Sequence, residues 1–185
     1  MKKYPFLAYI SICLSLFAYT SYLISWDAPE ISVYRTELER LTGRRVSGTY
    51  NVVLASSAGE FSRLSRLGYW MLAGSADNTI YLQPLSLIPN LPRTLAHEMT
   101  HIYLAQFSLP YWLEEGLVCT VTGEWIGRHE KLLGSVEELD YTQMDFMTYR
   151  AFSYSCWRRV GELLRIYDFN ELVLNYSRSN SGSVF

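Results

Sequence analysis

The sequence predicts an α+β domain, and three observations lead to this fold class. Segments 49–55, 69–73 and 79–82 are rich in β-branched, aromatic or other apolar residues and are separated by turn-forming residues. From residue 93 onward, apolar residues recur at helical spacing. Hydrophobic residues make up 49% of the 185 positions and charged residues 18%, enough for one domain with a buried core. We expect a small mixed or antiparallel sheet over residues 49–83, packed on the next helix, and then a mostly helical half.

The first 26 residues differ in character from the rest. Lys2 and Lys3 precede an uncharged run from Phe6 to Ile24, whose length suits a membrane-spanning helix or the core of a signal peptide. The two lysines favour the cytoplasmic side, so the rest of the chain would lie outside the membrane. No clean cleavage site follows the run, which favours an uncleaved anchor; a cleaved chain would be secreted or periplasmic.

This division gives three parts: an anchor or signal segment at 1–26, a domain at 27–176 and a serine-rich tail at 177–185 that we expect to be flexible. Gly43 ends the first helical pattern of the domain, and Pro92 suits the first turn of a later helix. The charged residues 123–140 form either an exposed connector or a lid over a binding groove. Helices are expected at 30–42, within 56–67, and at 93–107, 111–122, 143–167 and 170–176.

Charge and cysteine content limit the possible functions. The net charge is −2, and it becomes −4 without the first 26 residues, so the domain lacks the clustered basic residues of a nucleic-acid-binding surface. The spacing of the three cysteines fits no zinc or redox motif. Cys119 and Cys156 either pair in an oxidising compartment or are two small buried apolar side chains.

The helix expected at 93–107 contains the motif His-Glu-x-x-His, formed by His97, Glu98 and His101. Residues four apart lie on the same helix face, one turn apart, so both imidazoles can bind one Zn²⁺ through nitrogen. Glu98 leaves the helix about 100° away from His97. Its carboxylate can instead take a proton from a water molecule that zinc has acidified to a pKa of about 7. The motif therefore predicts a zinc site with Glu98 as general base.

A catalytic zinc site needs a third protein ligand and an open position. The only other histidine is His129, and the nearest carboxylates are Glu114 and Glu115. A helix over 111–122 would bring one of these glutamates to the histidines. Adjacent helical residues differ by about 100°, so only one of the two should face the metal, and spacing alone leaves both open.

The two phrases His97-Glu-Met-Thr-His101 and Leu109-Pro-Tyr-Trp-Leu-Glu-Glu-Gly-Leu-Val118 together resemble the gluzincin metallopeptidases. They are most similar to small bacterial peptidase MA-like domains, and the resemblance covers about half of the chain. It implies a zincin-like fold and peptide hydrolysis. It also implies that the third ligand is the glutamate directly before the glycine, which is Glu115, and that Glu114 is variable. The strand at 79–84 would be the edge strand that pairs with an extended peptide.

The resemblance raises two further points about the surroundings of the metal. Larger gluzincins carry an acid one turn after the third ligand as a partner for a histidine; here Cys119 occupies that position, so the partner must come from elsewhere. A donor is also needed for the oxyanion of the reaction, and related domains place a tyrosine-bearing helix beside the metal. Tyr149 and Tyr154 are the candidates, with Tyr149 preferred, although core packing would also account for either.

The sequence thus predicts a zinc metallopeptidase that acts on a peptide or protein substrate outside the cytoplasmic membrane. His97, His101 and Glu115 would hold Zn²⁺, and Glu98 and Tyr149 would take part in catalysis. One alternative is a membrane-anchored binding or scaffolding module that keeps the zinc fold without catalysis. Another is a domain in which the two histidines are ordinary core residues. Glu98 favours the enzyme, because a structural zinc has no use for that carboxylate.

Overall fold

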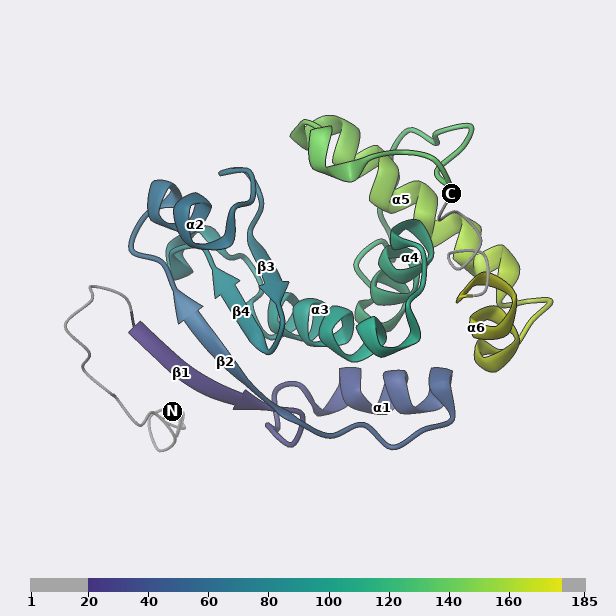
Figure 1. The fold of residues 1–185 in the computed structure, drawn as a ribbon, viewed down its shortest axis with the longest axis horizontal. Helices are drawn as coiled ribbons and strands as arrows, with labels where there is room; N and C mark the ends of the chain where they lie inside the picture. The colour runs from purple at the N-terminus through teal and green to yellow at the C-terminus, as the bar shows by residue number, and fades with distance from the viewer. Residues whose placement is uncertain (1–19, 178–185) are drawn as a thin grey trace, which may run out of the picture.

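The computed structural model describes residues 20–177, which form a four-stranded mixed sheet and six α-helices (Figure 1). The order of strands in the sheet is β1-β2-β4-β3. β1 is antiparallel to β2, β2 is parallel to β4, and β4 is antiparallel to β3. The predicted α+β class with a mixed sheet is therefore confirmed. The strands are β1 Thr20–Ser25, β2 Thr49–Leu54, β3 Ala73–Ala76 and β4 Thr79–Leu82.

Most helices lie within a few residues of their predicted ranges, because local signals fix their ends. Gly43 adopts φ 66° and ends the first helix, and Gly123 ends the fourth with φ 62°. The side chain of Asn90 accepts a hydrogen bond from the backbone N–H of Arg93 at the start of the third. The α-helices are α1 Ser32–Thr42, α2 Ala58–Ser65, α3 Leu91–Leu104, α4 Tyr111–Thr122, α5 Phe146–Leu163 and α6 Phe169–Ser177, and short 3₁₀ turns lie at Leu85–Leu87, Ala105–Phe107 and Tyr141–Gln143.

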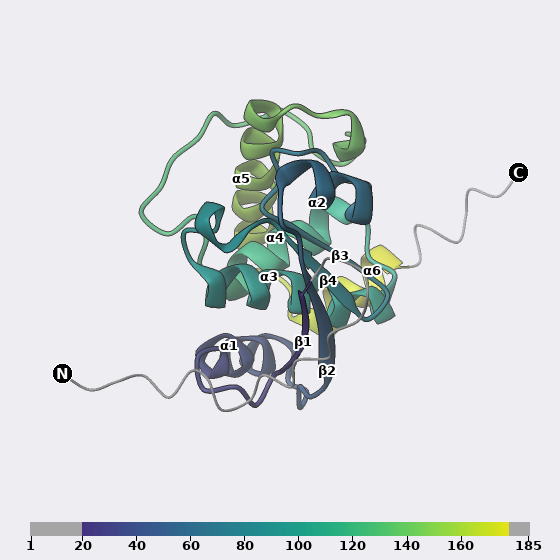
Figure 2. The ribbon, with the colours of Figure 1, turned by 90° about the vertical axis from the view of Figure 1, so that its left-hand side faces the viewer.

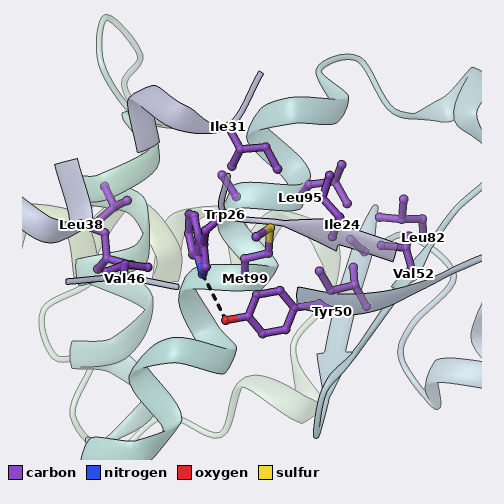
Figure 3. Close-up of a cluster of buried hydrophobic side chains, with 14 of the residues drawn as sticks. Ile24, Trp26, Ile31, Leu38, Val46, Tyr50, Val52, Leu82, Leu95 and Met99 are labelled. Carbon is purple, nitrogen blue, oxygen red and sulfur yellow. Dashed lines mark hydrogen bonds between the residues drawn. The ribbon is translucent and has the colours of Figure 1, made fainter. Parts of the chain in front are cut away.

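A first hydrophobic core lies between the sheet, α1 and α3 (Figure 3). Trp26 is fully buried at its centre, and its indole N–H donates to the hydroxyl of Tyr50 at 3.1 Å. Leu95 and Met99 fill this core from α3. This face of α3 is therefore fixed against the sheet, and its remaining faces are available for other contacts.

A second hydrophobic core lies between α4, α5 and α6, on the other side of α3 from the sheet (Figure 1). α4 and α5 approach closely at Gly116, where an added Cβ would lie 2.5 Å from the carbonyl oxygen of Cys156. Figure 2 shows α1 and α5 at opposite sides of the molecule, with α3 and α4 between them. Cys119 and Cys156 are both buried free thiols, so the alternative of a disulfide between them is wrong.

The N-terminal part of the domain differs from the prediction. Thr20 to Ile24, the last residues of the run expected to span a membrane, belong to β1 and pair with β2. Ile24 and Trp26 are buried in the first core, so the folded domain includes residues assigned to the anchor segment. Within residues 20–177, no helix is both long enough and apolar enough to cross a bilayer. The rest of the expected anchor, 1–19, and most of the expected tail, 178–185, lie outside the described residues.

The strands next to the third helix also require a correction. The strand Thr79–Leu82 was expected at the edge of the sheet, but it lies between β2 and β3, and β3 forms the edge. The segment predicted as strand 69–73 is extended only from Ala73 onward. Before that point, the Gln83 side-chain amide donates to the carbonyl oxygens of Tyr69 and Met71, at 2.8 and 3.1 Å. The Gln83 side chain, together with one backbone hydrogen bond from the Gln83 N–H to the Leu72 carbonyl oxygen at 3.0 Å, therefore attaches this loop to the sheet.

Candidate metal centre

Helices α3 and α4 bring three potential metal ligands together. His97 and His101 leave the same face of α3, and Glu115 of α4 lies opposite them. The two Nε2 atoms are 3.2 Å apart. Oε2 of Glu115 is 3.2 Å from Nε2 of His101 and 3.7 Å from Nε2 of His97. Of the two glutamates that spacing left open, Glu115 is thus the one directed at both imidazoles.

These three side chains fit a tetrahedral ion. Bonds of about 2.0–2.1 Å in tetrahedral geometry place ligand atoms about 3.3–3.4 Å apart, close to the three distances observed. Glu115 is completely buried, and its Oε2 has no hydrogen-bond partner in the described part of the chain. A buried carboxylate oxygen without a partner is costly, and an ion at this point would satisfy it. His97, His101 and Glu115 could therefore hold a metal ion.

Each histidine also faces a second carboxylate with its outer ring nitrogen. Nδ1 of His101 is 2.6 Å from Oε1 of Glu114, and Nδ1 of His97 is 3.2 Å from Oε2 of Glu124. A carboxylate in this position holds the ring in one orientation and leaves the Nε2 lone pair for a metal. Glu124 is the carboxylate partner of a ligand histidine that the sequence lacks at position 119, where Cys119 stands. Glu114 contacts the outer nitrogen of His101 and is not placed as a ligand.

The carboxylates dominate the electrostatics of both histidines. Burial by itself lowers the pKa of His101, but its hydrogen bond with Glu114 and the negative charge of the nearby Glu115 outweigh burial and raise this pKa to about 10. The pKa of His97 is raised in the same way, against burial, by Glu124 and Glu115. Burial raises the pKa of Glu115, but the facing histidines more than reverse this and lower it to about 2. The surrounding carboxylates therefore favour a positive charge between these side chains.

Glu98 occupies a different position from the other glutamates. It is 7% exposed and lines a cleft of about 510 Å³, together with His97 and His101. Its carboxylate makes no hydrogen bond or ion pair with any residue among 20–177. The cleft is bounded on one side by the edge strand β3 and on another by the aromatic rings of Tyr111, Tyr141 and Tyr149. Glu98 is therefore available to a molecule bound in the cleft.

Of the two candidate tyrosines, only Tyr149 reaches this cleft. Its hydroxyl lies 3.1 Å from that of Tyr111, whose ring stacks on His101 with centroids 5.9 Å apart. Burial raises the pKa of both phenols well above the usual value, so both keep their protons. Tyr154 is instead buried beside Trp125, and its hydroxyl is 3.4 Å from Nδ1 of His129. The third histidine and Tyr154 thus lie outside the site.

Sequence reasoning missed Glu124, Tyr111 and Tyr141. Glu124 directly follows the glycine that ends α4. An acidic residue at that position was the sequence signal that could have identified Glu124 as part of the site. Tyr111 belongs to the phrase that contains Glu115, but its stacking on His101 depends on how α3 and α4 pack.

Comparison with known proteins gives no further identification. No protein-family model matches the sequence, and neither the curated proteins nor the solved structures contain a match to it.

Proposed function

We propose that this protein is a zinc-dependent metallopeptidase of the gluzincin type, with His97, His101 and Glu115 as the metal ligands. The observation that carries the proposal is the position of Glu98. It is a carboxylate without a partner among residues 20–177, and it lines the cleft next to two imidazoles and a buried carboxylate oxygen that are spaced for one ion. A structural metal site has no use for such a group.

When bound, zinc would supply a Lewis acid that polarises a peptide carbonyl and acidifies water in the cleft. Glu98 accepts a proton from the attacking water and returns it to the leaving amine. Tyr149 donates its hydroxyl proton in a hydrogen bond to the oxyanion that forms on the carbonyl. Glu114 and Glu124 keep the two imidazoles in position during these steps.

The edge strand supports an extended peptide as the substrate. Among the described strands β3 pairs only with β4, so its other edge can pair with another strand along the cleft. A peptide added there would run past His97 and Glu98. The position of the domain outside the membrane remains a prediction that rests on Lys2, Lys3 and the apolar run that follows them.

Replacing Glu98 with Gln tests this function. Glu98→Gln keeps the shape of the side chain and leaves all three ligands in place, so the protein should still bind one equivalent of zinc. Hydrolysis of an unfolded protein substrate should fall at least 10²-fold, because an amide cannot accept the proton. Metal content by elemental analysis and product formation by mass spectrometry measure the two effects. Unchanged hydrolysis would refute the mechanism, and a wild-type protein that binds zinc without hydrolysing any substrate would favour the binding module.

A further inference from the structure

A second group of potential metal ligands lies on the far side of the His97 ring from the first. It consists of Nδ1 of His97, Sγ of Cys119 and Oε2 of Glu124, and these atoms lie within 4.8 Å of one another. Nδ1 of His97 is 3.2 Å from Oε2 of Glu124, and Sγ of Cys119 is 3.9 Å from the same oxygen. The three side chains come from α3, from α4 and from the residue after the glycine that ends α4.

The surroundings of Cys119 are unusual for a buried cysteine. Sγ is 3.2 Å from the hydroxyl oxygen of Ser153 and 3.5 Å from Oε1 of Glu115. The indole of Trp125 donates to that same hydroxyl at 3.1 Å, so the hydroxyl proton is free to point at the sulfur. Cys156, in contrast, lies among apolar side chains of the second core. The sulfur of Cys119 therefore has two polar side chains beside it, in addition to the rings of Trp125 and Tyr154 that pack with it.

We propose that His97, Cys119 and Glu124 form a second site for a thiophilic divalent cation such as Zn²⁺, Co²⁺ or Cd²⁺. Tetrahedral bonds of about 2.0 Å to nitrogen and oxygen and about 2.3 Å to sulfur place such ligands about 3.3–3.6 Å apart. The observed 3.2 and 3.9 Å from Oε2 of Glu124 therefore require shifts of only a few tenths of an ångström, and the third pair, His97 and Cys119, lies within 4.8 Å. The side chain of Glu124 is 33% exposed, which leaves a path for the ion and room for a water ligand.

The second cation replaces two protons, one from the thiol of Cys119 and one from Nδ1 of His97, and both pass to solvent. His97 then bridges the two cations as an imidazolate, with Nε2 on the first and Nδ1 on the second. Glu124 changes from the hydrogen-bond partner of His97 into a ligand. An imidazole ring shared by two cations binds each of them more weakly than a ring that binds one. We therefore expect metal in excess of one equivalent to inhibit hydrolysis at the first site.

Titration with Co²⁺ tests the second site through the thiolate. The full chain is purified in mild detergent and freed of metal, and Cys13→Ala is included in every sample to remove the only cysteine outside the described residues. The first equivalent should give only weak visible bands, because its ligands are nitrogen and oxygen. The second equivalent should add the intense near-ultraviolet charge-transfer band of a thiolate bound to Co²⁺. Glu98→Gln should show the same two stages, so the test does not depend on hydrolysis.

Two variants assign the band, and one serves as a matched control. Cys119→Ser should abolish the band and the second equivalent, whereas the control Cys156→Ala should keep both. Glu124→Gln should bind the second equivalent at least tenfold more weakly, because a neutral amide is a poor ligand. The proposal is overturned if no thiolate band appears at two equivalents in the wild-type background, or if the band persists in Cys119→Ser.

Discussion

Two adjacent glutamates of α4 have different positions around the same histidine. Glu115 is fully buried and directs Oε2 at the inner nitrogens of His97 and His101, whereas Glu114 contacts the outer nitrogen of His101. Side chains at adjacent helical positions diverge by about 100°, so one can enter the site while the other passes around the ring. His101 is therefore held between two carboxylates, and each residue of the pair can be tested separately.

Alanine substitutions should distinguish a ligand from its supporting residue. Glu115→Ala removes one of three ligands and should abolish metal binding at micromolar metal. Glu114→Ala keeps all three ligands but frees the His101 ring, so it should retain one equivalent and bind it about 10–100-fold more weakly. Competition against a chelator measures both affinities, with Glu138→Ala at an exposed position as the control. The opposite order of effects would mean that Glu114 is the ligand.

In the proposed mechanism, the hydroxyl of Tyr149 acts on the substrate and not on the metal. Tyr149→Phe keeps the ring that packs against Trp70, with centroids 5.5 Å apart, and removes only the donor. Loss of one oxyanion donor costs about 10²–10³ in kcat, so kcat should fall by that factor with metal affinity unchanged. Tyr154→Phe, outside the cleft, provides the matched control. A fall in KM or metal content without a fall in kcat would contradict the role given to Tyr149.

Part of this site could be predicted from the sequence because it depends only on local geometry. The common face of His97 and His101 follows from the helical period, and so does the different direction of Glu98. Glu124 could not be predicted in the same way. Its position depends on Gly123, whose φ of 62° ends α4 and turns the chain so that the next residue faces His97. Contacts that rely on such a turn cannot be derived from periodicity.

At the scale of elements, the contact between α4 and α5 depends on one glycine. A Cβ at position 116 would lie 2.4 Å from a methyl carbon of Val160 and 2.5 Å from the backbone oxygen of Cys156. The methyl group could move, but the oxygen belongs to the backbone of a helix. The glycine next to Glu115 therefore allows α4 to pack closely on α5, and the position of Glu115 depends on this packing.

Gly116→Ala should destabilise the protein, and a second glycine offers a control. The helices must separate to admit the methyl group, at a cost of about 1–3 kcal/mol in the free energy of unfolding. At Gly161, near the end of α5, an added Cβ meets no atom within 4 Å. Gly161→Ala should therefore stabilise the helix by about 0.4–1 kcal/mol. Urea denaturation measures the change in the free energy of unfolding for both variants. Equal changes would show that the close approach of α4 and α5 at Gly116 does not determine the stability of the protein.

The elements that could be predicted are those with local start and stop signals. α4 has the predicted range of 111–122, and α1 ends at Gly43 as expected. β1 was missed because its short alternation, with Tyr22 and Ile24 directed to the core, lies at the end of a longer apolar run. β3 was displaced because its small residues, Ala73 to Ala76, resemble a turn. In these two cases pairing with a neighbouring strand decided the outcome, and pairing is not a local property.

On the scale of the whole molecule, the candidate metal centre is built from two helices that pack mainly in different hydrophobic cores. α3 contributes Leu95 and Met99 to the core against the sheet, and α4 contributes Leu113 and Leu117 to the core against α5. The histidines belong to the first of these helices and Glu115 to the second. An ion bound by all three would link the two halves of the domain, so metal binding and folding should be coupled.

Removing the metal should therefore lower the stability of the whole domain in one transition. An ion present at about 100 times its dissociation constant contributes about 2.7 kcal/mol to the free energy of unfolding, provided that the unfolded chain does not bind it. Chelation should remove this contribution from the wild type and change nothing in Glu115→Ala, which no longer holds the ion. Calorimetry with and without chelator measures the difference. If the metal connects the two cores, the unfolding midpoints of Trp26 in the first core and Trp112 in the second, followed by near-ultraviolet circular dichroism, should shift together on chelation. A shift confined to one of these signals would show that the cores unfold independently and that the metal does not join them.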